Sequence, residues 1–312
     1  MVDLLQKIKD SIAQGLQFDS RDEVEKLIKK NRLNEALIVL NRDLRANPKN
    51  TFLLSLKADL FFDLERIVEA SIAYEKVLKI KPNSKDDLAN LGNCLYEIKD
   101  YKNSLNVYEK YLKLEPEDAE FLTNKADVLC DLKQPHEALK FIEESLKINP
   151  NDLRSLFSYS IILSDLKKYA ESNEILDKLI KEDPEDSYYW INMSENFFHL
   201  MKFSECINAT DRALEIIPND EMALTNKATA LIEIGNLEEA MGCVQQAIEF
   251  TPTFDESWYQ KARILAKQDS LENSLDALLV SVSIDKDNKE RAKSEKDFRN
   301  MKNYERFKKI TT

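Results

Sequence analysis

Proline residues divide most of the chain into segments of equal length. Seven of the eight prolines are spaced 34 positions apart, namely Pro48, Pro82, Pro116, Pro150, Pro184, Pro218 and Pro252. One further step leads to Lys286, where residues 284–288 closely copy residues 148–152 without the proline. The period therefore predicts eight repeats. They span residues 17–50, 51–84, 85–118, 119–152, 153–186, 187–220, 221–254 and 255–288.

The pattern of apolar and small residues inside each repeat predicts two helices. Position 4 is Leu or Trp from the second repeat onward, and position 11 is Leu or Phe in all eight. Because these positions lie seven apart, they share one helical face. Small residues at position 20, and at position 8 from the second repeat onward, would let the two helices approach closely. The X-Pro step ends the second helix, so each repeat reads helix, short turn, helix, proline turn.

The two ends of the chain lie outside this frame. Apolar residues at helical spacing from Leu4 to Leu16 predict an N-terminal capping helix over residues 1–16, and residues 20–23 fit a capping box that opens the first repeat. Residues 289–312 carry nine basic and four acidic side chains. Their aromatic and methionine residues are spaced as a helical stripe: Phe298, Met301, Tyr304 and Phe307. This basic C-terminal tail either caps the exposed last repeat or occupies a groove of a neighbouring copy, as autoinhibition or as a homo-oligomer contact.

This repeat resembles the tetratricopeptide repeat. That family shares the 34-residue period and the order Trp/Leu, small, Tyr/Leu, Ala, Phe/Tyr, Ala, Pro, and the resemblance covers residues 17–288. The closest matches are Trp258-Tyr259-Gln260-Lys261-Ala262 and Asn236-Leu237-Glu238-Glu239-Ala240. The resemblance implies an all-α fold, a right-handed α-solenoid of eight 34-residue helix-turn-helix units with terminal capping helices. It also implies a non-catalytic adaptor or scaffold whose first helices line a concave groove.

Composition and charge narrow the classes of function. Only four glycines occur, so we expect few turns with positive φ and no glycine-rich phosphate loop. The net charge of −12 disfavours nucleic acid as a partner. No apolar stretch is long enough to insert into a membrane, and the start of the chain lacks the features of a signal peptide, which predicts a cytoplasmic protein.

Nothing in the sequence assembles a catalytic or cofactor site. The four cysteines form no CxxC pair, and two histidines without an HExxH motif predict no metal site. Nucleophile motifs are missing as well, so we expect no enzyme activity and no cofactor. The cysteines are expected to be ordinary core residues in a reducing compartment.

The predicted groove carries a row of amides. In the tetratricopeptide family, positions 2, 5, 6, 9, 12 and 13 tend to face the groove, and position 6 here holds Asn90, Asn124, Asn192 and Asn226. A carboxamide both donates and accepts hydrogen bonds, so such a ladder can bind the backbone of an extended peptide. The alternative is that these residues are tolerated polar residues on exposed helices. Position 5 offers no lysine, which disfavours the family's clamp for acidic chaperone tails.

Charged and apolar groove positions predict the ligand's character. The polar positions are Asp59, Asn93, Glu97, Asp127 and Glu195, and the apolar ones are Phe157, Ile161, Tyr188, Ile191 and Phe198. The acids would meet basic side chains of a peptide, and the apolar residues would form an anchor pocket, unless local curvature buries them against one another. The sequence therefore predicts a protein or peptide partner with basic and apolar side chains. A self-associating structural scaffold and a regulatory subunit of a larger complex remain alternatives.

Overall fold

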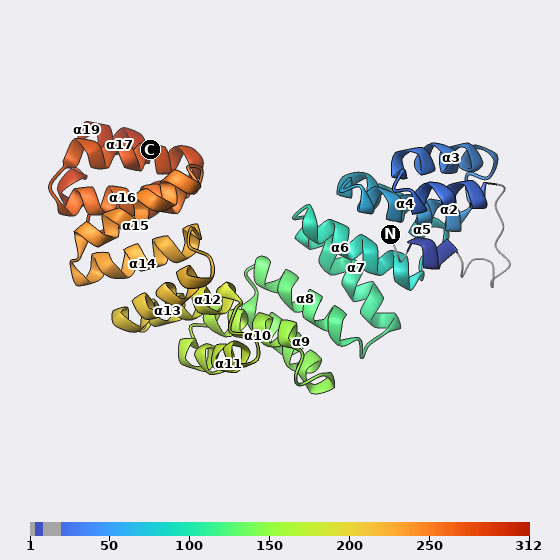
Figure 1. Cartoon of the computed structure of the whole chain (residues 1–312), viewed down its shortest axis with the longest axis horizontal. Helices are drawn as coiled ribbons and strands as arrows, with labels where there is room; N and C mark the ends of the chain where they lie inside the picture. The colour runs from blue at the N-terminus through green and yellow to red at the C-terminus, as the bar shows by residue number, and fades with distance from the viewer. Residues whose placement is uncertain (1–3, 9–19) are drawn as a thin grey trace. The chain divides into compact units, whose positions relative to one another are not determined.

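The chain folds into a series of paired helices. A computed structural model describes residues 4–8 and 20–312, and every regular element in these two ranges is helical (Figure 1). The first helices of the repeats are α2 (Arg21–Lys29), α4 (Thr51–Asp63), α6 (Lys85–Glu97), α8 (Ala119–Asp131), α10 (Leu153–Asp165), α12 (Ser187–His199), α14 (Glu221–Ile234) and α16 (Asp255–Lys267). The second helices are α3 (Leu33–Ala46), α5 (Ile67–Ile80), α7 (Tyr101–Leu114), α9 (Pro135–Ile148), α11 (Tyr169–Glu182), α13 (Phe203–Ile216), α15 (Leu237–Phe250) and α17 (Leu271–Ile284).

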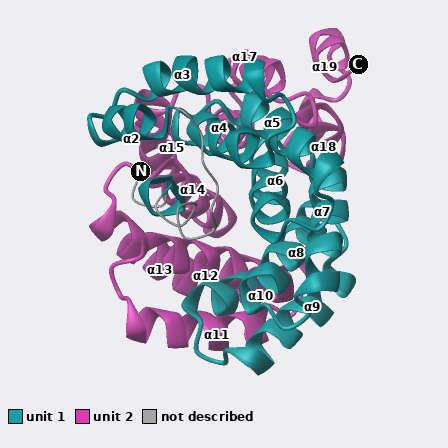
Figure 2. Cartoon of the chain, turned by 90° about the vertical axis from the view of Figure 1, so that its right-hand side faces the viewer, with its two compact units in different colours: residues 1–158 teal, residues 159–312 magenta. Residues whose placement is uncertain are grey.

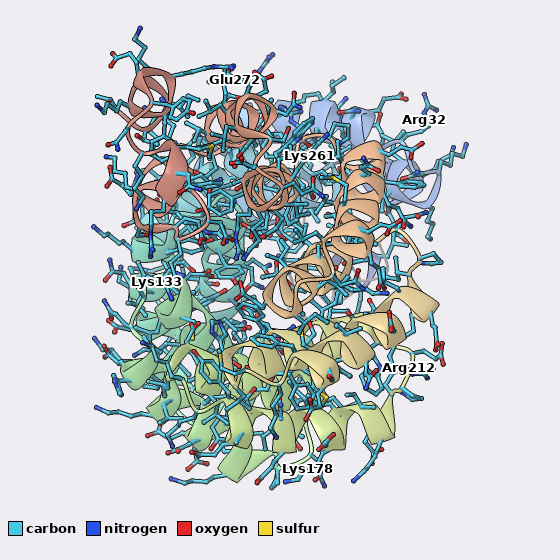
Figure 3. All side chains as sticks on the ribbon, turned by 90° about the vertical axis from the view of Figure 1, so that its left-hand side faces the viewer. Arg32, Lys133, Lys178, Arg212, Lys261 and Glu272 are labelled. Atoms are coloured by element: carbon cyan, nitrogen blue, oxygen red, sulfur yellow. The ribbon has the colours of Figure 1, made fainter. Side chains whose placement is uncertain are left out.

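The all-α repeat array is confirmed, and the helices fall in the predicted frame. From the second repeat onward, the first helix begins at position 1 and the second helix covers positions 17–30. Pro135 lies at the first turn of α9, where proline costs no hydrogen bond. The array divides into two compact units, residues 1–158 and 159–312, with the division inside α10 (Figure 2). Charged side chains such as those of Arg32, Lys178 and Arg212 project into solvent (Figure 3).

The proline turn also starts the next helix. In each repeat the position 31 amide donates to the carbonyl at position 27, which closes the second helix just before position 32, a proline in all but the last repeat. Position 34 then accepts hydrogen bonds from the following helix N-terminus. The side chains that do so are Asn50, Asp118, Asp152, Asp186 and Asp220. The fixed spacing of turn and cap keeps successive repeats in register.

Small residues at positions 8 and 20 bring the two helices of a repeat together, as predicted. Ala58, Ala126 and Ala228 at position 8 are fully buried, and so are the residues at position 20. In the third repeat Ser104 Oγ donates to the carbonyl of Gly92 at 2.9 Å, and the Tyr108 ring fills the space that a Cβ on Gly92 would need. The close approach therefore depends on the absence of larger side chains at these two positions.

The expectation that positive-φ turns are scarce is wrong. Each repeat has one left-handed residue at position 15, with φ between 55° and 83°. Seven of the eight are not glycine; the set is Asn31, Glu65, Lys99, Lys133, Lys167, Met201, Gly235 and Asp269. In every repeat the backbone amide at position 16 donates a hydrogen bond to the carbonyl at position 11, which gives a partner to a carbonyl at the end of the first helix. This bond and the helix contact it permits outweigh the cost of a left-handed residue, about 1 kcal/mol each.

The chain ends differ in detail from the sequence expectations. Residues 4–8 are helical, but the rest of the capping helix predicted over residues 1–16 lies outside the described residues. Ser20 precedes α2 without capping it, because its hydroxyl donates to Asp43 Oδ1 at 2.9 Å. The capping box is therefore wrong.

The C-terminal tail forms short helical pieces instead of one helical stripe. They are α18 (Asn288–Ser294), the 3₁₀ turn η1 (Arg299–Met301) and α19 (Glu305–Thr311). Phe298, Met301 and Phe307 are buried in one cluster with residues of α16 and α17, whereas Tyr304 remains 41% exposed. The tail is packed on its own last repeat.

Two glycines offer a clean test of the turn. A Cβ would meet no atom within 4 Å at Gly235 or at Gly242. Gly235 has φ 83°, so Gly235→Ala should lower the free energy of unfolding by about 1 kcal/mol. Gly242 lies inside α15, so Gly242→Ala should raise it by about 0.5–1 kcal/mol. Urea unfolding followed by circular dichroism measures both, and two shifts of the same sign would contradict this account of the turn.

Candidate functional site

The first helices of unit 1 form a polar cavity that gathers four of the predicted groove residues. We call it the amide–acid cavity. It encloses about 600 Å³, and its lining includes Asn93 and Glu97 from α6 and Asn124 and Asp127 from α8. Positions 6, 9 and 13 of a helix lie on one face, which explains why these four side chains converge. The other lining residues are Phe62, Tyr96, Tyr108, Ala119, Glu120, Asn149, Asp152, Arg154 and Ser155.

The two asparagines of the amide–acid cavity have different surroundings. Asn93 is half-buried, and its Oδ1 accepts a hydrogen bond of 2.7 Å from the Tyr108 hydroxyl. Asn124 is only 9% exposed, at the cavity wall. Burial raises the pKa of the nearby Tyr96 phenol, helped by a hydrogen bond with Asp131, so the ring presents a neutral hydroxyl at pH 7. The wall thus offers amide and phenol groups to a ligand.

Asp127 is the most perturbed carboxyl of this cavity. Burial raises its pKa to about 6, and Asp131 adds to the shift, whereas a hydrogen bond with Ser158 and the charge of Arg154 oppose it. Arg154 Nη2 lies 2.9 Å from Asp127 Oδ2, and 54% of the Arg154 side chain is exposed. A cation of the chain itself therefore covers one of the acids predicted to meet a basic ligand.

Along the first helices, the amides of the predicted ladder have different hydrogen-bond partners. Asn192 Nδ2 donates to the Tyr188 carbonyl of its own helix at 2.8 Å. Asn226 Nδ2 donates to Ser194 Oγ at 3.2 Å, across the contact between α12 and α14. Asn90 is half-buried and lies within reach of the Tyr74 hydroxyl. Asn124 is the ladder residue that lines the cavity.

The residues of the predicted apolar anchor differ in burial. Ile191 is 1% exposed and packs with Ala213 and Ala223, so it is a core residue and the expectation of a groove contact is wrong. Position 5 is buried in most repeats. Phe157 belongs to unit 1 and Ile161 to unit 2, and both are half-buried.

On α12, the remaining residues of the anchor differ in exposure. Tyr188 is 57% exposed. Phe198 is half-buried, with its ring 5.7 Å from that of Phe203. Glu195 is exposed and lies 4.0 Å from His199 Nε2. The imidazole of His199 stacks on Tyr169 with ring centroids 4.7 Å apart. Tyr188 is therefore the one of these three predicted residues that presents a large apolar surface.

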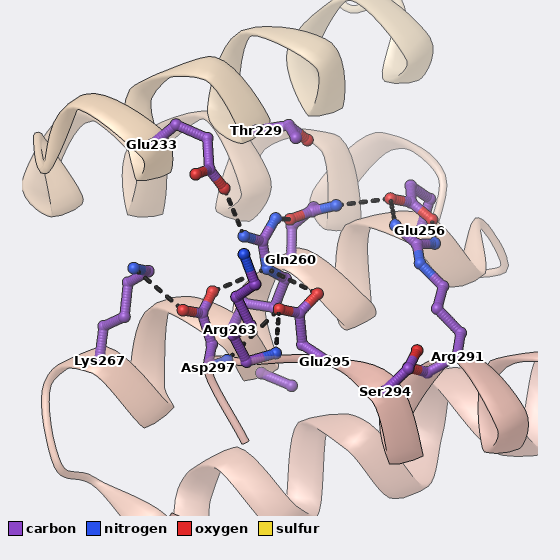
Figure 4. Close-up of polar contacts among 12 residues, drawn as sticks. Thr229, Glu233, Glu256, Gln260, Arg263, Lys267, Arg291, Ser294, Glu295 and Asp297 are labelled. Atoms are coloured by element: carbon purple, nitrogen blue, oxygen red, sulfur yellow. Dashed lines mark hydrogen bonds and ion pairs between the residues drawn. The ribbon is translucent and has the colours of Figure 1, made fainter. Parts of the chain in front are cut away.

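Both ends of the chain place charges against first helices. Asp59 of α4 accepts a hydrogen bond of 2.6 Å from Lys7 Nζ, so the N-terminal segment covers this predicted groove acid. At the other end, Arg263 of α16 is held by Glu233 at 2.7 Å and by Asp297 at 2.9 Å (Figure 4). Asp297 also lies 3.0 Å from Lys267, so the acidic turn of the tail covers Arg263 and Lys267 of α16.

Sequence reasoning missed Arg154, Tyr96 and Glu120 as members of the cavity. They occupy positions 2 and 12 of their repeats, which belong to the same groove set as the residues that were predicted. Their positions in the repeat were therefore enough to predict them as groove residues. The pairing of Arg154 with Asp127 could not have been found, because it joins helices of two repeats.

Other chemistry has little support in the part of the chain that the structure describes. Within residues 4–8 and 20–312, His, Cys, Asp and Glu side chains form no group of three suited to a metal ion. No helix in those ranges is long and apolar enough to cross a membrane. The four cysteines are free thiols, and burial raises the pKa of Cys94 and Cys206 to about 12, so both are unreactive near neutral pH.

Family models match three stretches of the chain. Residues 53–84 and 223–254 match the model described as tetratricopeptide repeat. These two matches fall inside the second and seventh repeats. Residues 98–179 match the model described as anaphase-promoting complex, cyclosome, subunit 3. No curated protein sequence matches the chain.

Solved structures of similar fold include three that cover most of this chain. YrrB, a TPR protein with an unusual peptide-binding site, is 20% identical with a TM-score of 0.50, covering 60% of this chain and 97% of YrrB. A tetratricopeptide repeat protein from Parabacteroides merdae is 19% identical with a TM-score of 0.64, covering 86% and 99%. A chain of the APC/C hetero-tetramer Cut9-Hcn1 is 12% identical with a TM-score of 0.63, covering 92% of this chain and 54% of that chain. At these identities the likeness shows the fold alone.

The raised pKa of Asp127 predicts a pH-dependent stability. The fold disfavours the ionised carboxyl, so the stability that the wild type has relative to Asp127→Asn should be greatest near pH 4 and decline as the pH rises through about 6. We expect the difference in unfolding free energy to change by about 1–3 kcal/mol between pH 4 and pH 7. Urea unfolding at several pH values measures it, with Glu97→Gln as the control for loss of one charge. A difference that stays constant would contradict the raised pKa.

Proposed function

Because the chain is a tetratricopeptide repeat protein, we propose that it acts as a non-catalytic scaffold that binds a peptide segment of a protein partner. The observation that carries this proposal is the convergence of amides and carboxylates in the amide–acid cavity. Four acids line it, namely Glu97, Glu120, Asp127 and Asp152, against the single cation Arg154. The excess of negative charge favours a ligand with a Lys or Arg side chain.

Each group of the cavity has a role that its chemistry allows. The carboxamide of Asn124 can donate to a peptide carbonyl and accept from a peptide amide. Glu97 is exposed and can meet a basic side chain at the rim. A guanidinium or ammonium of the ligand would compete with Arg154 for Asp127, which keeps the acid from being left unpaired in either state. The ligand would therefore exchange one ion pair for another, which gives charge selectivity at modest affinity.

A second candidate is membership of a larger protein complex. The match of residues 98–179 to the model of an anaphase-promoting complex subunit favours it, and the two proposals are compatible if the bound segment belongs to another subunit. We also propose a cytoplasmic location, which is consistent with four free cysteines.

Affinity capture with paired variants tests the proposal. Asn124→Ala and Asp127→Asn together should remove a partner that the wild type captures from a native lysate, with the bound proteins identified by mass spectrometry. The matched control is Asn192→Ala, since this position 6 asparagine bonds to its own helix. Circular dichroism establishes that all variants are folded.

The expected partner should bind about tenfold or more weakly to the cavity variant, and its binding should weaken with salt. A partner lost with Asn192→Ala but kept by the cavity variant would place the binding surface in unit 2. A partner kept by both would contradict binding through these amides.

A further inference from the structure

The N-terminal segment presents a lysine to a polar site on α4. Lys7 Nζ donates to Ser55 Oγ at 2.7 Å and to Asp59 Oδ2 at 2.6 Å. Ser55 and Asp59 occupy positions 5 and 9 of the second repeat, so one turn of α4 supplies both contacts. We call Ser55, Asp59 and Asp87 the lysine site.

The lysine site is built so that a cation is needed there. Asp59 also accepts a hydrogen bond of 2.6 Å from the Tyr74 hydroxyl, and only 14% of its side chain is exposed. Asp87 is 4% exposed and accepts hydrogen bonds from Ser55 and Ser84. Burial raises the pKa of Asp59, Lys7 opposes the shift, and Asp87 adds to it. Lys7 bonds directly to Asp59 and, through Ser55, is connected to Asp87, and two carboxylates removed from water are costly unless a positive charge lies beside them.

Apolar residues flank the lysine and hold it in place. Leu4 and Ile8 are 3% and 0% exposed, and both belong to one cluster with Val24 and Ile28 of α2 and with leucines of α4. Leu4, Lys7 and Ile8 lie three and four residues apart, so a single helical face carries all three. A segment that binds here must therefore carry both a positive charge for the lysine site and apolar residues for the cluster beside it.

The segment that fills the site is suited to being displaced. Residues 4–8 contact the repeats through Leu4, Lys7 and Ile8, so a segment that offers the same three contacts can take their place. Residues 9–19 connect it to Ser20, which makes its binding an intramolecular event with a finite effective concentration. A second segment of the same chemistry can compete with it.

We propose that the lysine site is a docking site for a partner's helical segment that carries a lysine with an apolar residue three positions before it and another directly after it, and that residues 4–8 occupy this site in the free protein. The proposal rests on the proposed interaction function for the nature of the ligand, a protein segment. It assigns a different surface from the amide–acid cavity, since none of Ser55, Asp59 and Asp87 lines that cavity. The N-terminal segment is then a built-in competitor that sets a threshold for partner binding.

The test uses the full chain and a labelled peptide with the sequence of residues 1–10. Leu4→Asp with Lys7→Glu releases the segment by removing an apolar contact and reversing the charge beside Asp59. Fluorescence anisotropy should show the peptide binding to this released chain at least about tenfold more tightly than to the wild type. Adding Asp59→Asn to the released chain should weaken binding by about tenfold or more, whereas Glu75→Gln, an exposed acid of α5, should not. A peptide with glutamate in place of the lysine should not bind.

Equal affinity for the wild type and the released chain would overturn the proposal, as would insensitivity to Asp59→Asn. Neither result bears on the cavity, whose own test changes Asn124 and Asp127. If the released chain does not fold, hydrogen exchange of residues 4–8 in the wild type decides the question. Saturating peptide should accelerate their exchange by about tenfold, and unchanged exchange would overturn the proposal. A wild-type dimer joined by exchanged N-terminal segments would assign the site to a second copy and would overturn it too.

Discussion

The close contact between positions 8 and 20 is the constraint on which the rest of the structure depends. Serines at position 20 donate to the position 8 carbonyl in the third, fifth and eighth repeats, at 2.9, 2.8 and 2.7 Å. Such bonds require the backbones to lie within one small side chain of each other, so the second helix cannot rotate. With the helix pair fixed, the face that positions 2, 6, 9 and 13 present is fixed as well, and this is the face that carries the amide–acid cavity and reaches Asp59.

The sequence allows the helix frame to be predicted because proline and small residues act locally. Pro135 and the position 8 and 20 residues specify where helices start and how closely they pack, and the structure agrees. The left-handed turns were missed because their signal lies in the backbone. Lys99 and Met201 adopt positive φ since the amide that follows reaches the position 11 carbonyl, not because of any preference of their side chains.

The site was predictable in part, for a related reason. The repeat frame places Asn93, Asn124 and Asp127 on the corresponding faces of two successive first helices, and all three line the cavity. Ile191 fails because its side chain is buried against Ala213 and Ala223, contacts that the repeat frame alone does not contain. The ion-pair partners of the acids could not be predicted, because Lys7 and Asp59 lie 52 residues apart in the sequence and Arg154 and Asp127 lie 27 apart. Only the folded chain brings such charges together.

In three ion clusters, a charge on a first helix is paired with an opposite charge from another part of the chain. Asp59 is covered by Lys7, Asp127 by Arg154, and Arg263 by Glu233 and Asp297, so each half-buried or buried charge has an opposite charge from the same chain. A carboxylate removed from water is tolerated only when such a partner replaces the lost solvation. The covering residues differ in how tightly their surroundings are packed. Asp297 is followed by the fully buried Phe298, whereas the side chain of Arg154 is 54% exposed. We therefore expect the proposed ligand exchange to be easier at Asp127, whose covering arginine is 54% exposed, and at Asp59, whose covering lysine lies outside the repeats, than at the last repeat.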